Sequence, residues 1–201
     1  MSKENLLTLF KEKQYSKIIF IIEQIENDKK TPALYNLLGV CRMLSTNSNE
    51  SIKLAIENFK KSYFLEEDKT KTKETLKNLI NASVTFFDNE TKNKKELGNE
   101  FFEELKLIYN ENQELFVNDL DLSKALLKVL KRSSSAENII YYLNKITNKH
   151  SDADLIASYN FFNNYTYDWQ QVDYYNNSTK INDKLPSFLS DNKLTNFKFS
   201  K

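Results

Sequence analysis

The chain contains only two glycines and two prolines among its 201 residues. A chain of this length with ordinary composition would carry roughly 14 glycines. Loops that hold a nucleotide phosphate need several closely spaced glycines, because backbone N–H groups must approach the phosphate oxygens. Here Gly39 and Gly98 stand 59 positions apart. Sheets also use glycine and proline in their turns, so the shortage predicts an all-α protein without a nucleotide-binding loop.

The charge balance and the cysteine content narrow the class of partners. Lysine and arginine number 29 against 28 acidic residues, and only Arg42 and Arg132 are arginines. Nucleic-acid binding usually needs arginine and a basic face, so we expect no nucleic-acid partner.

The longest apolar run, Ile18 to Ile22, is far shorter than the ~20 residues of a membrane span, so we expect no membrane association. A single cysteine and a leading segment without a long apolar run favour a cytoplasmic location.

Apolar residues recur at helical spacing along most of the chain, which predicts about ten helices. The expected ranges are 3–11, 14–27, 32–45, 50–66, 71–88, 92–110, 113–131, 135–148, 152–166 and 169–182. The breaks are short and polar, as in antiparallel helices packed side by side. Pro32 suits the first turn of a helix, and Ser134–Glu137 and Ser151–Asp154 have the spacing of capping boxes at helix starts.

The predicted helices repeat in pairs with a period of about 37 residues, and the clearest unit runs from Leu34 to Glu67. Its signature residues are Tyr35, Leu38, Gly39, Ala55, Phe59 and Ser62. A glycine leaves room for the partner helix, while large rings fill the groove between neighbouring pairs. The pattern resembles the tetratricopeptide repeat, whose 34-residue unit places large and small residues in this order.

This resemblance implies a right-handed superhelical array of antiparallel helix pairs, an α-solenoid, over residues 1–166. Weaker matches at Tyr15 to Ile25 and at Ala136 to Leu143 are consistent with four or five repeats, and about three are needed to bury a continuous core. Residues 167–201 are expected to form an aromatic-rich capping or junction helix followed by a tail.

The residues that usually carry chemistry are scarce and scattered. His150 is the only histidine and lies near a predicted helix end, where a structural role is expected. Cys41 lies beside core positions of the clearest repeat and is expected to be a buried small residue. Adjacent acids such as Glu103 and Glu104 diverge on a helix, so they do not form a catalytic carboxylate pair. We therefore assign no catalytic residue, no metal site and no cofactor.

Aromatic residues are concentrated near the C-terminus. Eight fall within 17 positions: Tyr159, Phe161, Phe162, Tyr165, Tyr167, Trp169, Tyr174 and Tyr175. Helical arrays need a cap at their open ends, so we expect most of these rings to close the array. Aromatic rings also stack on sugars, peptides and bases, which makes Tyr159, Phe162, Tyr165 and Tyr167 candidate ligand-binding residues.

The stretch after the last predicted repeat contains a short motif of Asp168, Trp169 and Asp173, followed by Pro186 in the segment Leu-Pro-Ser-Phe-Leu. It resembles the junction that follows the repeats in protein O-linked N-acetylglucosamine transferases and in the bacterial SPINDLY-like proteins of glycosyltransferase family 41. In those enzymes a two-lobed α/β domain after the junction holds the sugar nucleotide and the catalytic groups. The resemblance therefore implies a catalytic domain, in cis or in trans, that these 201 residues do not contain.

Two functions are consistent with these patterns. The first is a noncatalytic tetratricopeptide-like scaffold that binds a protein or peptide on an extended surface. The alternative is the N-terminal substrate-recognition arm of a family 41-like protein O-glycosyltransferase whose catalytic domain is missing. We expect no enzyme activity from the chain itself under either hypothesis.

Overall fold

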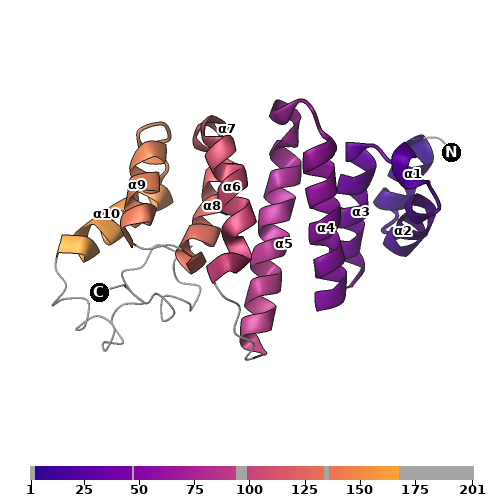
Figure 1. Cartoon of the computed structure of the whole chain (residues 1–201), viewed down its shortest axis with the longest axis horizontal. Helices are drawn as coiled ribbons and strands as arrows, with labels where there is room; N and C mark the ends of the chain where they lie inside the picture. The colour runs from indigo at the N-terminus through magenta and orange to yellow at the C-terminus, as the bar shows by residue number, and fades with distance from the viewer. Residues whose placement is uncertain (1–2, 47, 94–98, 134–135, 168–201) are drawn as a thin grey trace. The chain divides into compact units, whose positions relative to one another are not determined.

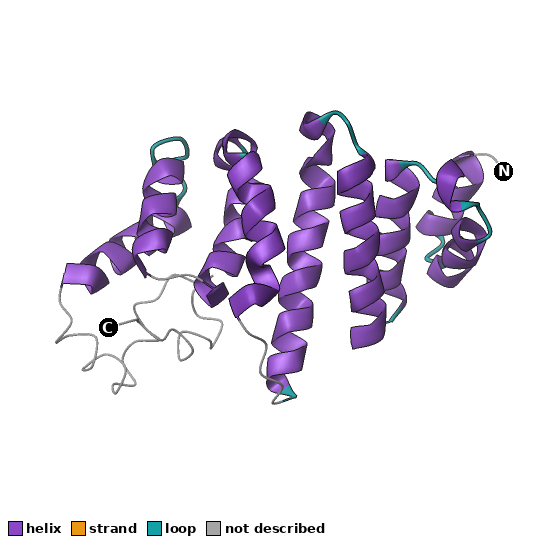
Figure 2. Ribbon diagram, viewed as in Figure 1, coloured by secondary structure: helices purple, strands orange, loops and turns teal. Residues whose placement is uncertain are grey.

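Helices and the turns that join them make up the described part of the chain (Figures 1 and 2). The computed structural model describes residues 3–46, 48–93, 99–133 and 136–167, and no strand occurs within those ranges. The predicted all-α class is therefore confirmed for these residues. Internal packing divides the chain into two units, unit 1 from Met1 to Glu100 and unit 2 from Phe101 to Lys201.

The described part of unit 1 is a succession of five helices, each packed against the next along the chain (Figure 1). They are α1 (Lys3–Lys11), α2 (Tyr15–Glu23), α3 (Pro32–Ser45), α4 (Asn49–Leu65) and α5 (Lys73–Lys92), with 3₁₀ turns η1 (Asn27–Lys29) and η2 (Lys69–Thr72) between them. Helix α3 also touches α5, so α3, α4 and α5 are in mutual contact.

Local signals start the two central helices of unit 1. The Thr31 hydroxyl accepts a hydrogen bond from the Leu34 backbone N–H at 3.4 Å, and Pro32 occupies the first helical turn. The Ser48 hydroxyl accepts a hydrogen bond from the Ser51 N–H at 3.2 Å. These side chains satisfy N–H groups that have no partner within the helix. The predicted role of Pro32 in a first turn is confirmed.

A lysine side chain caps the C-terminal end of α4. The Lys69 ammonium donates to the backbone oxygens of Tyr63 and Glu66, at 3.0 and 2.8 Å, and it lies 4.3 Å from the centre of the Tyr63 ring. A cation at this position satisfies carbonyl groups at the helix C-terminus and is favoured by the helix dipole.

The close approach of α3 and α4 depends on a glycine. A Cβ atom built on Gly39 would lie 2.5 Å from Cε1 and 2.8 Å from Cδ1 and Cζ of Phe59. The Phe59 side chain is itself 1% exposed, so its ring occupies the space that any side chain at position 39 would need. The two helices can therefore pack at this distance only because position 39 carries no Cβ atom.

A buried hydroxyl joins the three helices α3, α4 and α5. The Ser62 hydroxyl on α4 donates to the Pro32 carbonyl oxygen of α3 at 2.8 Å. It also lies 3.3 Å from the Thr75 hydroxyl of α5. Because Ser62 has only one hydrogen to donate, Thr75 is the donor of the second bond. The small polar residue at this position thus has hydrogen-bond partners on both neighbouring helices.

The described part of unit 2 also contains five α-helices, again packed in chain order. They are α6 (Glu103–Glu111), α7 (Gln113–Asn118), α8 (Leu120–Ser133), α9 (Ala136–Thr147) and α10 (Ala153–Tyr167), and the 3₁₀ turn η3 (Asn99–Phe102) precedes α6. Helix α7 also contacts α9.

Aromatic rings form the centre of unit 2. The Tyr109 ring meets the rings of Phe116 and Tyr142 edge-on, with centroid distances of 5.6 and 5.5 Å. The Tyr142 hydroxyl donates to the Ser123 carbonyl oxygen at 3.4 Å, and burial raises the pKa of this hydroxyl. These four residues come from α6, α7, α9 and α8, so one aromatic cluster ties four helices together.

The loop after α9 is held by two side chains. Nε2 of His150 lies 2.9 Å from the Val117 carbonyl oxygen at the end of α7, which requires this nitrogen to carry the hydrogen. Asp152 accepts a hydrogen bond from the Leu155 N–H at 3.1 Å and forms an ion pair of 2.6 Å with Lys124 of α8. Asp152 therefore both starts α10 and attaches it to α8.

Several predicted helix boundaries are wrong. The expected helix 92–110 does not begin at Lys92, which is the last residue of α5. The expected helix 113–131 is broken at Asp119, whose backbone is extended and whose carboxylate accepts from the Leu122 N–H at 3.1 Å. The predicted helix 14–27 ends at Glu23.

The capping predictions have separate outcomes. Ser151 is not the cap of the last described helix, because Asp152 takes that position and also bonds to Lys124. Ser134 lies outside the described residues. The predicted boundary between residues 1–166 and 167–201 falls where the description of the chain ends, so that division stays a prediction.

None of the described helices is long and apolar enough to cross a membrane.

We expect Gly39→Ala to destabilise the protein. This is the opposite of what helix propensity alone predicts, because alanine favours the helix over glycine by about 1 kcal/mol. The added methyl group would overlap a buried ring, and overpacking of this kind typically costs about 1–3 kcal/mol. Urea unfolding followed by circular dichroism measures the change. The double variant Gly39→Ala/Phe59→Leu should recover part of the loss, because leucine removes the ring atoms. Strictly additive losses would contradict the assigned contact.

We expect the charge of Asp152 to stabilise the fold at neutral pH and to lose this effect in acid. The hydrogen bond from Lys124 is the main cause that lowers the pKa of Asp152, and the bond from Leu155 adds to it. The contribution is therefore complete above the unfolded-state pKa of about 3.9 and disappears as the pH falls through the lower folded-state pKa.

The variant Asp152→Asn tests this expectation, because asparagine still caps a helix but cannot form the ion pair. Its thermal midpoint should lie below that of the wild type at pH 7, by the equivalent of about 0.2–1 kcal/mol. The difference should shrink as the pH is lowered below about 4. Glu114→Gln, at an exposed position on α7, is the control. A difference that persists unchanged in acid would contradict the role of the charge.

Candidate functional site

Helix α3 presents two contrasting faces. Tyr35, Leu38 and Gly39 are buried; Gly39 lies against Phe59 of α4, and Leu38 belongs to a core cluster with Ile18 and Ile22 of α2. The opposite side carries a row that we call the α3 stripe, at relative positions 1, 5, 8 and 12 of one helical face. The α3 stripe consists of Ala33, Leu37, Val40 and Leu44. Leu44 is 52% exposed, Ala33 is exposed, and Leu37 and Val40 are partly exposed; Leu37 also packs against the core cluster shared by α2 and α3.

A row of polar uncharged residues on α5 lies beside the stripe. The Asn78 side-chain amide donates to the Asn36 side-chain oxygen at 3.2 Å, which brings the middle of α3 next to the start of α5. Asn78, Asn81 and Thr85 share one face of α5 by helical spacing, and the exposed Glu74 precedes them on the same face. We call this the α5 polar row, and we call the stripe and the row together the α3–α5 face.

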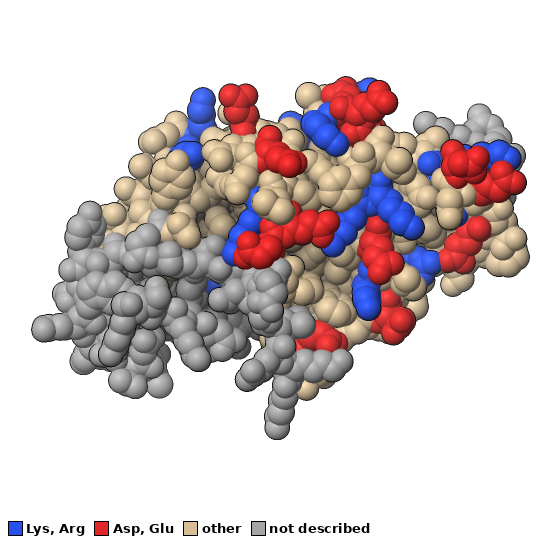
Figure 3. Space-filling view, in the orientation of Figure 1, with Lys and Arg blue, Asp and Glu red and all other residues tan. Residues whose placement is uncertain are grey.

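The four residues of the α3 stripe are uncharged, and the charged residue of α3 points elsewhere. The one charged residue of α3 is Arg42, whose side chain is 15% exposed and forms an ion pair with Glu23 of α2. Arg42 therefore points toward α2 and contributes no cation to the α3–α5 face. Elsewhere on the visible face of unit 1, lysine and acidic side chains lie close to one another (Figure 3), so no large area of a single sign is seen in that view.

The α3–α5 face can bury apolar side chains and offer amide and hydroxyl groups for hydrogen bonds. The α3 stripe has no ionisable side chain, whereas on α5 an ion pair of 3.2 Å between Glu74 and Lys77 lies at the start of the polar row. Within the described residues, no group of three or more His, Cys, Asp or Glu side chains is placed to hold a metal ion.

Cys41 lies behind the α3–α5 face in the core of unit 1. It is fully buried in a cluster with Ile18, Ile22 and Leu38. Burial raises the pKa of its thiol to about 11, so the reactive thiolate is rare at neutral pH. The expectation that Cys41 is a small buried residue is confirmed.

The structure brings the six predicted repeat residues together. Those on α3 are Tyr35, Leu38 and Gly39, and those on α4 are Ala55, Phe59 and Ser62; all six are buried. They support the α3–α5 face from beneath without forming part of it. Their membership in a tetratricopeptide repeat stays a prediction.

The candidate ligand-binding aromatics do not form one exposed surface. Phe162 is fully buried in α10, where its ring stands edge-on to that of Phe161 at 5.3 Å, so it has no accessible surface for a ligand in this structure. Tyr159 is partly buried. The side chains of Tyr165 and Tyr167 lie outside the described part of the chain.

The exposed stripe is the feature that the sequence reasoning missed. The signal was present, because residues 31–41 contain no charged side chain and Ala33, Leu37 and Val40 recur at helical spacing. The two sides of α3 are both apolar, however, and the spacing alone does not tell which side packs against α4. The positions of α2 and α4 together separate the core side from the accessible side.

Comparisons with protein-family models, curated proteins and solved structures give no match to this chain. The junction residues Asp168, Trp169, Asp173 and Pro186 lie outside the described residues. The resemblance to family 41 glycosyltransferases therefore stays a prediction.

We expect Cys41 to resist thiol reagents in the folded protein. Its burial and its raised pKa both suppress the thiolate that would attack the reagent. With Ellman's reagent at pH 8, the native chain should release almost no chromophore on the timescale on which free cysteine reacts fully. One equivalent should appear after unfolding in guanidinium chloride. Rapid stoichiometric reaction of the native chain would contradict the assigned core position.

Proposed function

We propose that this protein is a noncatalytic tetratricopeptide-like scaffold that binds a protein or peptide partner on its α3–α5 face. The observation that carries the proposal is the uncharged, partly exposed stripe of Ala33, Leu37, Val40 and Leu44 beside the α5 polar row. An exposed apolar surface bordered by polar groups is typical of an interaction site. A right-handed superhelical arrangement of the helix pairs is part of the same proposal.

The size of the stripe favours a polypeptide as the ligand. From Ala33 to Leu44 the helix rises about 16 Å, at about 1.5 Å per residue. An extended segment of about five residues, or three turns of a helix, covers that length. Helical surfaces of this kind commonly bind segments of other proteins through apolar anchors.

The support beneath the stripe suits a binding surface. The Gly39–Phe59 contact and the Ser62 bonds to Pro32 and Thr75 hold α3, α4 and α5 in fixed positions. A surface carried on rigid helices loses little conformational entropy when the partner binds. The partner would therefore meet a preformed face.

The proposal predicts that charge placed on the α3–α5 face abolishes binding. We would immobilise the full chain, capture proteins from a lysate of its source cells and identify them by mass spectrometry. A partner bound through this face should be captured by the wild type and reduced at least tenfold with Leu44→Glu and with Asn81→Glu. Both positions are exposed, so the variants should keep the helical circular dichroism of the wild type.

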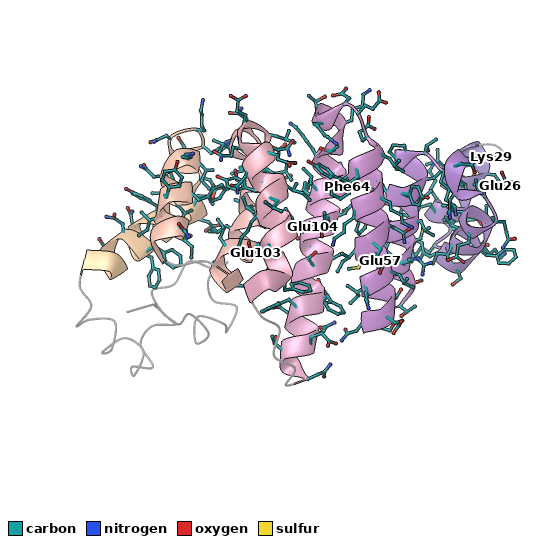
Figure 4. The ribbon with its side chains drawn as sticks, viewed as in Figure 1. Glu26, Lys29, Glu57, Phe64, Glu103 and Glu104 are labelled. Atoms are coloured by element: carbon teal, nitrogen blue, oxygen red, sulfur yellow. The ribbon has the colours of Figure 1, made fainter. Side chains whose placement is uncertain are left out.

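The matched control is Phe64→Glu. Phe64 is an exposed apolar residue, 59% exposed, near the end of α4 (Figure 4), on a helix side that does not belong to the α3–α5 face. This variant should capture as much partner as the wild type. Capture that is equal for all variants, or no specific capture by the wild type, would contradict the proposed function.

A further inference from the structure

Helix α2 exposes a large aromatic side chain. The α1–α2 pair lies at the end of unit 1 that is farthest from α5, and α2 packs against α3 (Figure 1). Ile18 and Ile22 are fully buried on the inner side of α2. Phe20 lies two residues from each of them, about 200° around the helix, and it is 66% exposed. The outer side of α2 is therefore centred on a solvent-exposed apolar ring.

This composition is typical of a helix that has a partner on both sides. Residues 18–22 are all apolar, and five successive residues extend more than once around a helix. A helix at the end of a helical stack normally presents a polar outer side, whereas a helix that is apolar all round is usually covered. The ring of Phe20 thus marks the side of α2 where a partner is to be expected.

Two opposite charges flank the ring and indicate what the partner is. Lys17 precedes Phe20 by three residues and Glu23 follows it by three, so both lie on the side of the ring, about 4.5 Å before and after it along the helix axis. Both are exposed, as are Ser16 and Gln24. We call these five residues the outer face of α2. Reversing the direction of the helix about the ring exchanges the positive and the negative position, so this face is complementary to a reversed copy of itself.

We infer that a second copy of this chain packs against the outer face of α2, with the two α2 helices antiparallel and related by a two-fold axis at Phe20. A two-fold interface uses the same surface on both subunits. In this register the two Phe20 rings meet at the axis. Lys17 of each copy lies level with Glu23 of the other, which gives two equivalent ion pairs around an apolar centre.

The internal ion pair of Glu23 is compatible with this contact. Arg42 bonds to Oε1 of the Glu23 carboxylate, and the Glu23 side chain remains 45% exposed. A carboxylate offers two acceptor oxygens, so Lys17 of the other copy can approach Oε2. Leu7 of α1, which is 54% exposed, gives the same end of unit 1 a second exposed apolar side chain.

Light scattering of the full chain after gel filtration tests for the dimer. Because α2 has nine residues, the contact is small and belongs to the dissociable class of interfaces. In concentrated solution the wild type should have a mass near twice the 23.7 kDa of one chain, and the mass should fall toward that of one chain on dilution. A wild type that stays monomeric at every concentration would overturn the inference.

A matched pair of variants locates the contact. Phe20→Glu places two like charges at the two-fold axis, so it should weaken the dimer at least tenfold. Phe64→Glu introduces the same charge at an exposed aromatic position on α4, and it should leave the dimer unchanged. A dimer that survives Phe20→Glu would assign the assembly to another surface and would overturn the inference.

A charge-exchange experiment tests the register. Lys17→Glu and Glu23→Lys each place two like charges level with one another at both ends of the contact, so each variant alone should be monomeric. An equimolar mixture should form the dimer again, because each subunit then supplies the charge that the other lacks. A mixture that stays monomeric while both variants keep the helical circular dichroism of the wild type would overturn the inference. Phe20→Glu leaves the pair between Glu23 and Arg42 in place, so it decides the test if Glu23→Lys folds badly.

The assembly test is independent of the α3–α5 face. Leu44→Glu should lose the captured partner under the proposed function, yet it should keep the dimer. Failure of the dimer and failure of the proposed function are therefore distinguishable.

Discussion

The contact between Gly39 and Phe59 is the constraint on which the rest of unit 1 depends. Because position 39 has no Cβ atom, the ring of Phe59 can lie against the backbone of α3. That approach places the Ser62 hydroxyl within 2.8 Å of the Pro32 carbonyl oxygen and beside Thr75 of α5. The position of α5 next to α3, and with it the α3–α5 face, follows from how closely these two helices meet.

The proposed binding surface is a by-product of this packing combined with one ion pair. Helix α3 is apolar on two sides; α4 and α2 cover part of it, which leaves Ala33 and Leu44 exposed and Leu37 and Val40 partly exposed. Arg42 could have brought a charge to the surface, but its guanidinium pairs with Glu23 of α2. The two interactions together leave a surface that is suited to apolar side chains and to uncharged hydrogen-bonding groups.

Sequence reasoning was accurate where the decisive interaction is local. The start of α3 at Pro32 and the all-α class depend on residues a few positions apart. It was wrong where a distant residue or a single break decides. The helix expected over 113–131 is interrupted at Asp119, whose carboxylate starts a new helix. The residue that caps α10 is Asp152 and not Ser151, because Asp152 also forms an ion pair with Lys124 on another helix.

By itself, the sequence determined the helical class, the buried signature residues around Gly39, and the burial of Cys41. Helical periodicity and glycine scarcity act within a few turns of the chain, so they can be recognised without coordinates. The tertiary structure alone decided which apolar side of α3 is accessible, where the charge of Arg42 goes, and that Phe162 is buried while Ile156 is exposed. Each of these depends on which helix packs against which side, and that arrangement is set by contacts between residues far apart in the sequence.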